Sequence, residues 1–190
     1  SGSGKTTLLN IIGCILEPAS GWMRLDGDVV YDNRWLKGDL RRLRLEKIGF
    51  IFQFHNLLPF LDATDNVAIV RELAGASPAA ARQAAQDLLD YLDVGHRKNA
   101  MPAQLSGGEA QRVAIARALI HAPSVIFADE PTGALDQATG HEVMQILRAT
   151  ARMTGSTLVL VTHDLQVARW CERLIEIRDA LVHSDTRTEA

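Results

Sequence analysis

The first residues of the chain could hold a phosphate group. Ser1-Gly2-Ser3-Gly4-Lys5-Thr6-Thr7 matches the end of the pattern G-x-x-x-x-G-K-[ST], and Leu8 to Leu16 predicts the helix that follows such a loop. Small residues let backbone N–H groups wrap the phosphates, while Lys5 reaches the β- and γ-phosphates and the Thr6 hydroxyl binds Mg²⁺. A disordered Gly/Ser-rich terminus is the alternative, and the apolar helix directly behind the loop argues against it.

Two carboxylates could complete the chemistry of such a site. The run from Val125 to Ala128 predicts a buried strand, and Asp129 and Glu130 follow at its carboxyl end. In a protein with a lysine loop, the first acid holds the Mg²⁺ shell, and the second can polarise a water for in-line attack on the γ-phosphate. An exposed acidic turn before Pro131 is the alternative. Strand ends of an open α/β sheet face the ligand, which favours the catalytic role.

Two more strands are expected to deliver a polar side chain at the same edge. Ile48 to Phe52 is a β-branched and aromatic run ended by Gln53, and Thr157 to Thr162 is a second run followed by His163. Taken alone, such a glutamine or histidine is more often structural than functional. Their shared position at strand ends makes both residues candidates for the phosphate site.

A further anion-binding feature is the octapeptide Leu105 to Arg112, with the sequence L-S-G-G-E-A-Q-R. Ser106 followed three residues later by Glu109 forms a capping box, which predicts the start of a helix. The two glycines between them leave backbone N–H groups uncovered at a helix N-terminus, where the helix dipole favours an anion. A well-capped helix start that binds nothing is the alternative.

Composition restricts the class of protein. The chain has 190 residues, enough for one sizeable core, and 47% hydrophobic with 23% charged residues is ordinary for a globular domain. A net charge of -3 argues against nonspecific nucleic-acid binding as the main activity. The longest apolar runs are too short to cross a bilayer, and the sequence has no secretory signal pattern. Cys14 and Cys171 have no metal or redox spacing, which favours a reducing compartment.

The segments between these motifs predict alternating strands and helices. A hairpin is expected around Asp26-Gly27, a solvated helix face over the basic stretch Asp39 to Lys47, and a last strand at Leu174 to Ile177. Apolar spacing and capping residues predict helices at Thr64 to Ala74, Pro78 to Asp93, Ala110 to Ile120 and Gln137 to Met153. This alternation is typical of an α/β fold.

Read together, the motifs resemble those of the ATP-binding cassette (ABC) family of ATPases. After the lysine loop come Gln53 as the Q-loop, the octapeptide as the signature motif, and Asp129 with Glu130 as the Walker B acids. Gly133-Ala134-Leu135-Asp136 then matches the D-loop, and His163 matches the switch histidine. The resemblance covers residues 1 to about 182, nearly the whole chain.

The amino-acid sequence of one motif also resembles a subgroup of the family, and two positions of the chain differ from the usual family residues. Asp129 to Asp136 is most similar to the cassettes of macrolide exporters and lipoprotein-release systems. Ala110 stands where close relatives more often carry Gln, past the two glycines of the signature. Asp179-Ala180 stands where the family usually has Asp-Gly, so we expect a reshaped turn there.

The resemblance implies a fold and a domain organisation. We expect the α/β fold of P-loop NTPases (RecA-like), with a mostly parallel sheet flanked by helices and an inserted α-helical subdomain. Residues 1–58 and 117–183 would form the P-loop core, residues 59–116 the helical subdomain with the signature, and residues 184–190 a disordered tail. The first glycine of the loop, the strand before it and an adenine-stacking aromatic residue are expected to precede Ser1, which makes the chain an expected fragment.

The resemblance also assigns roles to single residues. It gives catalytic roles to Glu130, His163 and Gln53, and Gln53 also contacts the metal and the attacking water. The expected ligands of Mg²⁺ are Thr6, Gln53 and Asp129. The residues expected to contact ATP are Ser1, Gly2, Ser3, Gly4, Lys5, Thr6, Thr7, Ser106, Gly107, Gly108 and Asp136.

The function implied is the binding and hydrolysis of ATP, with Mg²⁺, at the interface of a head-to-tail dimer. ATP would lie between the lysine loop of one chain and the signature of the other, so a lone chain is expected to hydrolyse poorly. The expected partners are a second cassette, forming a homodimer, and a separate integral membrane permease of the export or mechanotransmission type, without nucleic acid. The expected location is the cytoplasmic face of the plasma membrane, as a peripheral subunit.

The stretch from Phe54 to Leu61 is a candidate docking surface for a permease helix. It is unusually apolar for a loop and directly follows Gln53. Clustered apolar residues in a loop mark a partner site more often than chance. The alternative is that these residues fold back over the helix predicted from Thr64.

Two other functions are less compatible with the sequence. A non-transport ABC ATPase of DNA repair, chromosome organisation or translation would carry a long coiled coil or two cassettes. Neither fits a chain of 190 residues without heptad repeats over several turns. A small-molecule P-loop kinase would leave the signature glycines and the strand-end histidine without a role.

Overall fold

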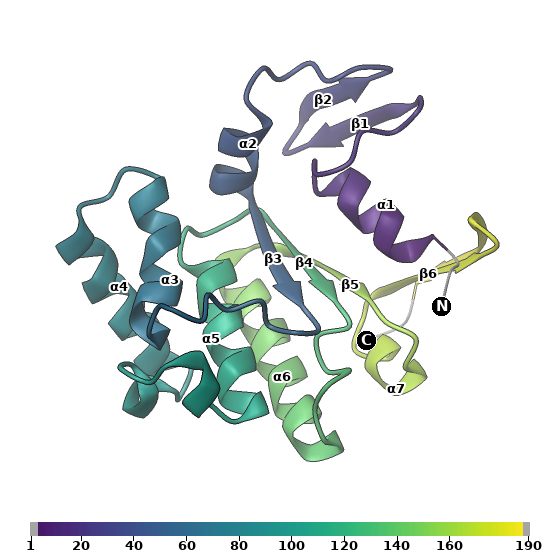
Figure 1. The fold of residues 1–190 in the computed structure, drawn as a ribbon. Coiled ribbons are helices and arrows are strands. Elements are labelled where there is room, and N and C mark those ends of the chain that lie inside the picture. The colour runs from purple at the N-terminus through teal and green to yellow at the C-terminus, as the bar shows by residue number, and fades with distance from the viewer. Residues whose placement is uncertain (1–3, 188–190) are drawn as a thin grey trace.

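Three parallel strands place their carboxyl ends side by side. In the computed structural model, which describes residues 4–187, β4 (Val125–Asp129) lies between β3 (Ile48–Phe52) and β5 (Thr157–Val161). The strands pair in register, with Phe52 opposite Asp129 and Asp129 opposite Val161. The residues that follow all three strands therefore leave the sheet at one edge (Figure 1). The predicted α/β fold and its strand-end arrangement are confirmed.

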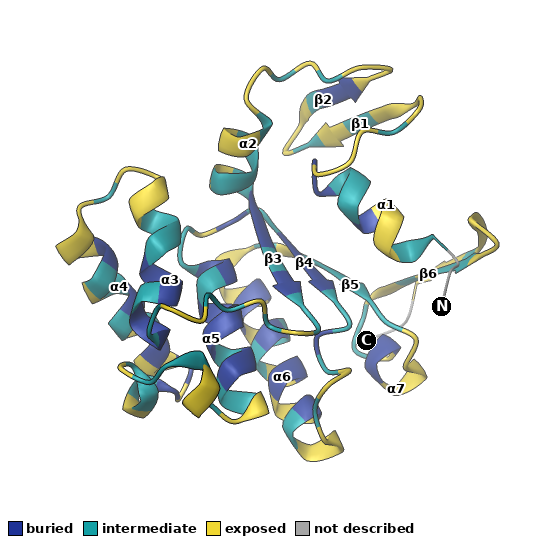
Figure 2. Ribbon diagram, in the orientation of Figure 1, coloured by how far each residue is buried: buried dark blue, intermediate teal, exposed yellow. Residues whose placement is uncertain are grey.

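Helices cover one face of this sheet (Figures 1 and 2). Ile126 of β4 is fully buried against α5 (Gly107–Leu119) and α6 (Gln137–Thr154) in a single apolar cluster. The same cluster includes buried residues of α3 (Ala63–Leu73) and α4 (Pro78–Tyr91), both of which contact α5. Helix α5 therefore joins the other helices to the sheet.

The opposite face of the sheet carries the N-terminal elements. Phe127 of β4 is buried with Leu9 of α1 (Lys5–Ile12), because neighbouring residues of a strand point to opposite faces. An antiparallel hairpin of β1 (Trp22–Leu25) and β2 (Asp28–Asp32) packs on the same side. Strand β4 is thus buried on both faces, as strands of parallel sheets usually are.

The remaining elements connect or extend this framework. Among the described residues, no helix is both long and apolar enough to span a membrane. The further elements are α2 (Leu40–Lys47), which confirms the basic helix, the 3₁₀ turns η1 (Gly95–Arg97) and η2 (Pro102–Gln104), and α7 (Leu165–Ala168), β6 (Arg173–Arg178) and β7 (Leu181–Arg187).

The expectation of a disordered tail over residues 184–190 is wrong for residues 184–187. They belong to β7, which pairs antiparallel with β6, and an ion pair joins Arg173 to Asp185 across the two strands. The turn that reverses the chain is Asp179-Ala180, with both residues in the left-handed region (φ 50° and 61°). Two such residues form a type I′ turn, whose twist suits a hairpin and continues the strand pairing past Val182. Residues 188–190 lie outside the described part of the chain.

The first helix is shorter than predicted. It ends at Ile12 rather than Leu16, because Gly13 caps it and Cys14 then adopts φ 58°, which is outside the helical region. Phe50 from β3 approaches Gly13 so closely that a Cβ there would lie 2.6 Å from its ring. The chain therefore turns away beneath a core aromatic residue.

The predicted division into a core and a helical subdomain has its second boundary within a helix. Residues 116 and 117 both lie in α5, and this helix contacts α3, α4, α6 and β3. The helical segment and the sheet therefore share one apolar cluster. The two-part division remains a prediction.

Candidate functional site

The predicted phosphate-binding loop leads into the first turn of α1. Gly4 precedes the helix with φ 84°, a left-handed conformation that glycine adopts without strain. Among the described residues no side chain caps this helix start, so its first N–H groups face outward, as at anion-binding helix ends. Lys5, Thr6 and Thr7 form the first turn. Ser1, Gly2 and Ser3, also predicted to hold phosphate, lie outside the described residues.

Asp129 lies beside this helix turn. The Thr6 hydroxyl donates a hydrogen bond to its carboxylate. Burial raises the pKa of Asp129, and the negative charge of Glu130 adds to the rise, while the Thr6 hydrogen bond and the charge of Lys5 oppose it. A partly buried carboxylate beside a second acid is stabilised by a nearby cation, so Asp129 and Thr6 fit a Mg²⁺ ion.

Magnesium does not need a cage built only from protein side chains. It usually binds through one or two carboxylates, waters and the phosphates of its nucleotide. Within residues 4–187, no cluster of three or more His, Cys, Asp or Glu side chains could hold a metal. The donor set that the described chain offers beside α1 is therefore Asp129 with the Thr6 hydroxyl.

Glu130 is held rigidly by the segment that follows β5. Its Oε1 accepts the backbone N–H of His163 at 3.1 Å and lies 2.6 Å from His163 Nδ1, while Oε2 accepts the Thr162 hydroxyl at 3.3 Å. An ionised carboxylate only accepts hydrogen bonds, so in that state of Glu130 the Nδ1 atom carries the proton. The Glu130 side chain is 18% exposed and that of His163 is 77% exposed. Of this pair, the histidine therefore presents the larger surface to a ligand.

Gln53 leaves β3 at the same edge and lies against Gly133. A Cβ built on Gly133 would lie 2.9 Å from Gln53 Nε2 and 3.3 Å from Cδ, so the amide touches the backbone of the segment that follows Glu130. The Gly133 N–H donates to the Glu130 carbonyl at 3.0 Å. The predicted contacts of Gln53 with the metal and the attacking water remain predictions.

The signature octapeptide forms the start of α5. The Ser106 hydroxyl accepts the Glu109 N–H at 3.3 Å, and the Glu109 carboxylate accepts the Ser106 N–H at 2.7 Å, which confirms the predicted capping box. The helix begins at Gly107, three residues before the predicted Ala110. Its glycines therefore form the exposed first turn, with backbone N–H groups near solvent.

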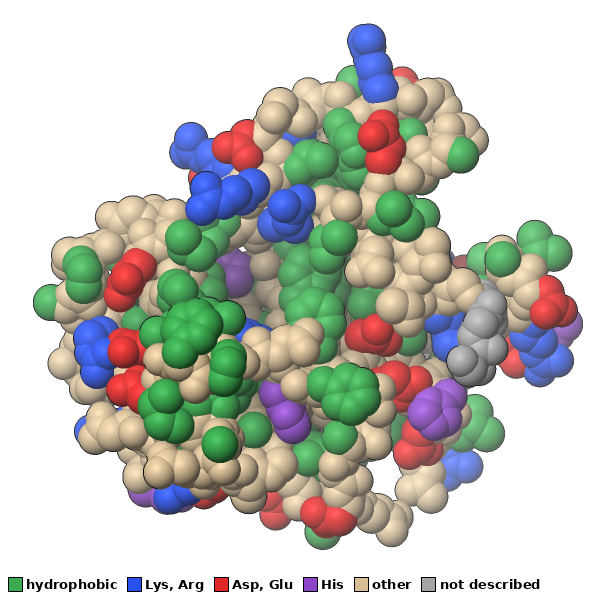
Figure 3. Space-filling view, viewed as in Figure 1, with side chains coloured by type: hydrophobic (Ala, Val, Ile, Leu, Met, Phe, Trp, Pro, Cys, Tyr) green, Lys and Arg blue, Asp and Glu red, His purple; other side chains and the backbone are tan. Residues whose placement is uncertain are grey.

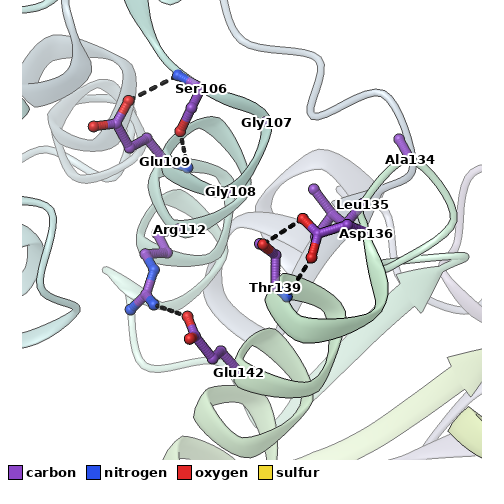
Figure 4. A pocket seen from close by; sticks show the side chains of 10 residues that line it. All are labelled: Ser106, Gly107, Gly108, Glu109, Arg112, Ala134, Leu135, Asp136, Thr139 and Glu142. Atoms are coloured by element: carbon purple, nitrogen blue, oxygen red, sulfur yellow. Dashed lines mark hydrogen bonds and ion pairs between the residues drawn. The ribbon is translucent and has the colours of Figure 1, made fainter.

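The D-loop residues lie across a groove from this helix start (Figure 4). Ser106, Gly107 and Gly108 line one side of an open groove of about 430 Å³, and the D-loop lines the other. Asp136 caps α6, as predicted, by accepting the Thr139 N–H at 3.1 Å and the Thr139 hydroxyl at 2.6 Å. An ion pair of 2.9 Å between Arg112 and Glu142 ties α5 to α6 at the same groove.

The structure gathers the predicted residues into two separate groups. Lys5, Thr6, Asp129, Glu130 and His163 lie together at the sheet edge and the start of α1. No residue of α1 lines the signature groove, and the first turns of α1 and α5 lie well apart in Figure 1. One copy of the chain therefore does not bring its own signature to its own lysine loop.

Two contacts within the site were not predicted from the sequence. The Thr162 hydroxyl holds Glu130 and also accepts the Asp164 N–H at 3.0 Å. A threonine at a strand end carries no signal of such a contact. Gly133 belongs to the D-loop motif, but its contact with Gln53 joins segments far apart in the sequence and could not be predicted from either one.

A second groove opens between α2, β3, α3 and α5, next to the apolar loop that follows Gln53. It has a volume of about 420 Å³ and combines apolar residues such as Phe52 with cationic ones such as Arg117. Within the loop, Phe54 and Phe60 are 77% and 71% exposed, and Figure 3 shows hydrophobic side chains gathered over this segment. Leu57 instead packs against the core. Leu57 therefore folds back onto the core, as the alternative prediction for this loop required, whereas the two phenylalanines do not.

One buried side chain fixes the shape of this loop. Asn66 of α3 is fully buried, and its Oδ1 accepts the Leu58 N–H at 2.7 Å. Its Nδ2 donates to the carbonyls of Leu58, Leu61 and Asp62 at 2.9–3.1 Å. A side chain that satisfies four backbone groups holds a loop in one conformation.

Comparisons with known proteins identify the family of the chain. The sequence profile described as ABC transporter matches residues 1–133. The chain is 50% identical over 189 residues to the macrolide export ATP-binding/permease protein MacB 1 of Aeromonas hydrophila, and 50% identical over 190 residues to MacB of Sodalis glossinidius. Both matches cover 100% of this chain but only 29% and 28% of those relatives.

Solved structures of a cassette share the fold. A dimeric, post-hydrolysis structure of the ATP-binding cassette MJ0796, bound to ADP and Pi, has a TM-score of 0.86 and 42% identity, over 98% of this chain and 81% of that one. A second dimeric MJ0796 structure, described as a bacterial ABC transporter cassette, has a TM-score of 0.87. The family match over most of the chain and this shared fold show that the chain belongs to the ABC transporter family and forms its ATP-binding cassette, an ATPase domain.

Proposed function

We propose that this cassette hydrolyses Mg-ATP at the interface of two copies arranged head to tail, and that hydrolysis drives export through a permease. The observation that carries the proposal is the hydrogen-bonded pair of Glu130 and His163 beside Asp129 and the start of α1. A phosphoryl-transfer site needs groups that position the nucleophile and others that neutralise developing charge. This edge of the sheet supplies both kinds of group.

The start of α1 binds the phosphates. Its outward N–H groups and the positive end of the helix dipole attract the anionic chain, and Lys5 adds a full positive charge. Thr6 and Asp129 would hold Mg²⁺, which when bound would neutralise negative charge on the phosphates. Binding the cation also removes the cost of keeping Asp129 charged in a partly buried position next to Glu130.

Glu130 and His163 act on the water and the γ-phosphate. The Glu130 carboxylate orients a water for in-line attack and accepts its proton. Its orientation is fixed by Thr162 and His163, so little rearrangement is needed at the moment of reaction. His163 presents its exposed ring to the γ-phosphate. Its Nδ1–H bonds to Glu130, and in the doubly protonated form of the ring Nε2–H donates a hydrogen bond to the phosphate.

The signature acts on the ATP held by the other copy. Because the N–H groups at Gly107 and Gly108 do not lie near α1 of the same chain, a second copy must deliver them. The dimeric MJ0796 structures support this arrangement. The second copy is proposed to be identical, since this one chain carries both halves of the site.

The permease is proposed to dock in the groove beside the apolar loop from Phe54 to Leu61. The similar MacB proteins are named as ATP-binding/permease proteins, and this chain spans about 29% of the Aeromonas relative. These names favour a permease in the same polypeptide, although a separate subunit would use the same surface. Either arrangement places the cassette on the cytoplasmic face of the plasma membrane, where ATP is supplied, with a macrolide-like compound as a candidate substrate.

The test is the change Glu130→Gln, measured as phosphate release by the complete protein. The amide keeps the shape of the side chain but cannot take the proton of water, so we expect turnover to fall by roughly two to four powers of ten while ATP binding persists. Glu172→Gln, which alters an exposed carboxylate paired with Arg152, is the matched control and should leave turnover unchanged. Retention of most of the wild-type rate by Glu130→Gln would remove Glu130 from the mechanism.

A further inference from the structure

The backbone conformation of residue 133 does not require a glycine. Its φ lies outside the left-handed region in which the glycines 4, 21, 27, 75 and 155 are found. An alanine could therefore adopt the same backbone without strain. The reason for the glycine must instead be space, because a Cβ at this position would lie 2.9 Å from Gln53 Nε2 and 3.3 Å from Gln53 Cδ.

The backbone at Gly133 bounds the Gln53 amide on one side. Among residues 4–187 the Gln53 side chain makes no hydrogen bond, so the backbone surface at Gly133 is the feature that limits its position. Gly133 is in turn tied to Glu130, since its N–H donates to the Glu130 carbonyl at 3.0 Å. The Glu130 carboxylate is held by Thr162 and His163. The amide therefore has a defined position relative to the proposed base.

We infer that Gly133 is a positioning residue for ATP turnover: its missing side chain lets the Gln53 amide lie on the segment that joins Glu130 to Asp136. This inference rests on the proposed role of Gln53 at the water and the metal. A side chain at residue 133 displaces the amide from the place that it occupies next to this segment. A displacement of about 1 Å is enough to slow a reaction that depends on alignment.

A Cβ on Gly133 would clash with the end of the Gln53 side chain, which can move. A positioning role of Gly133 can therefore be distinguished from a role in the stability of the fold. The nearest atoms are the far end of a flexible side chain, so an alanine at residue 133 moves Gln53 and leaves the fold intact. Gly140 offers a matched control in the next helix. A Cβ there would meet Thr132 at 3.4 Å, which is close to ordinary contact, and Thr132 has no role in the proposed mechanism.

The experiment is a double-mutant cycle in the complete protein with Gly133→Ala, Gln53→Ala and the pair. We expect Gly133→Ala to lower kcat by roughly tenfold, with KM for Mg-ATP and the melting temperature nearly unchanged. In the Gln53→Ala background the same change should have almost no further effect, because the group that it displaces is gone. Gly140→Ala should leave kcat unchanged.

The outcomes distinguish this inference from the proposed function. If Gln53→Ala slows turnover but Gly133→Ala has no effect, or an equal effect in both backgrounds, the positioning role is wrong and the role of Gln53 stands. A fall in melting temperature that accounts for the loss of kcat would also overturn it. If Gln53→Ala itself leaves turnover unchanged, both the role of Gln53 and the role of Gly133 fail.

Discussion

At the scale of single residues, Glu130 combines functional contacts with an uncommon backbone. Its φ is 49°, in a region that costs a non-glycine residue about 1 kcal/mol or more, and such strain clusters at active sites. Its N–H donates to the Val161 carbonyl at 2.9 Å, which keeps the residue against β5 while its carboxylate meets His163. The strained conformation is thus what brings the ends of two strands into one site.

A pH effect on folding also belongs to this scale. Burial lowers the pKa of His121 below its ordinary value of 6.5, although the hydrogen bond to the Ile48 carbonyl partly opposes the shift. Burial, and then the charge of Arg117, lower the pKa of His55 as well. The neutral forms are favoured in the folded state, so their contribution to stability is full above 6.5 and is lost as the pH falls through the lowered values.

We therefore predict that His121→Gln reduces the acid sensitivity of the fold. Glutamine keeps a donor for the Ile48 carbonyl but does not titrate. Between about pH 8 and about pH 5, the melting temperature of the wild type should fall further than that of the variant. Equal slopes for the two proteins in thermal unfolding would show that folding does not change the pKa of His121.

The sequence predicted which candidate site residues lie close together better than it predicted their contacts. Asp129, Gln53 and His163 follow strands, and parallel strands end at one edge, so their proximity could be predicted. The hydrogen bond from Thr162 to Glu130 and the contact of Gln53 with Gly133 could not. They depend on how separate loops turn after leaving the sheet, which no local pattern encodes.

At the scale of secondary structure elements, α5 sits unusually close to β3. A Cβ on Gly49 of β3 would lie 2.3 Å from the Ala118 carbonyl oxygen, and that atom belongs to a helix backbone that cannot swing aside. The same helix starts with the signature glycines and shares the apolar cluster with α3, α4 and α6. Close packing of α5 on the sheet therefore sets where the signature is presented.

We predict that Gly49→Ala destabilises the cassette by about 1–3 kcal/mol, the usual cost of overpacking a core. Gly38→Ala is the matched control, since nothing lies within 4 Å of its Cβ position and its φ is outside the left-handed region. Chemical unfolding of both variants gives the two free energies. A Gly49→Ala protein as stable as the control would mean that the helix can move away from the strand.

Strands were easier to predict from the sequence than the ends of helices. β3 is found at Ile48–Phe52, as predicted, because a run buried on both faces stands out from its neighbours. The end of α1 and the whole of β7 were missed for a physical reason. Both depend on left-handed non-glycine residues, Cys14 and Ala180, which local propensity does not favour at such positions.

At the scale of the whole molecule, the apolar loop after Gln53 runs from the candidate site to the outer surface. Asn66 holds the part of the loop around Phe60, through backbone groups of residues 58, 61 and 62. Arg117 binds the two carbonyls that follow Phe54, and both phenylalanines are exposed. Large exposed aromatic side chains on a held loop are typical of an interface. The exposure of these two residues depends on tertiary hydrogen bonds and could not be read from the sequence.

We predict that Phe60→Asp leaves the melting temperature of the cassette nearly unchanged but prevents its association with the permease. Leu57→Asp is the contrasting variant and should unfold the domain, because Leu57 packs against the core. Thermal unfolding and co-purification of the cassette with its permease part measure the two effects. Unfolding of Phe60→Asp, or undiminished co-purification, would contradict the docking proposal.

We propose that each ATP is hydrolysed by two copies of the chain, one supplying Lys5 and the other its signature. This proposal is tested by mixing two inactive variants, Lys5→Ala and Gly107→Asp. Gly107 occupies the first turn of α5, and a Cβ there meets only Leu135 at 3.4 Å, so the aspartate should fold normally while repelling the γ-phosphate.

The measurement is phosphate release by the complete protein after the two variants are unfolded and refolded together, or co-expressed, in equal amounts. Half of randomly formed dimers are mixed, and each mixed dimer has one intact site of two, so we predict recovery to about a quarter of the wild-type rate. If each chain instead used its own signature, every site in the mixture would stay defective. A mixture no more active than either variant alone would show that the signature does not act on the ATP held by the other copy.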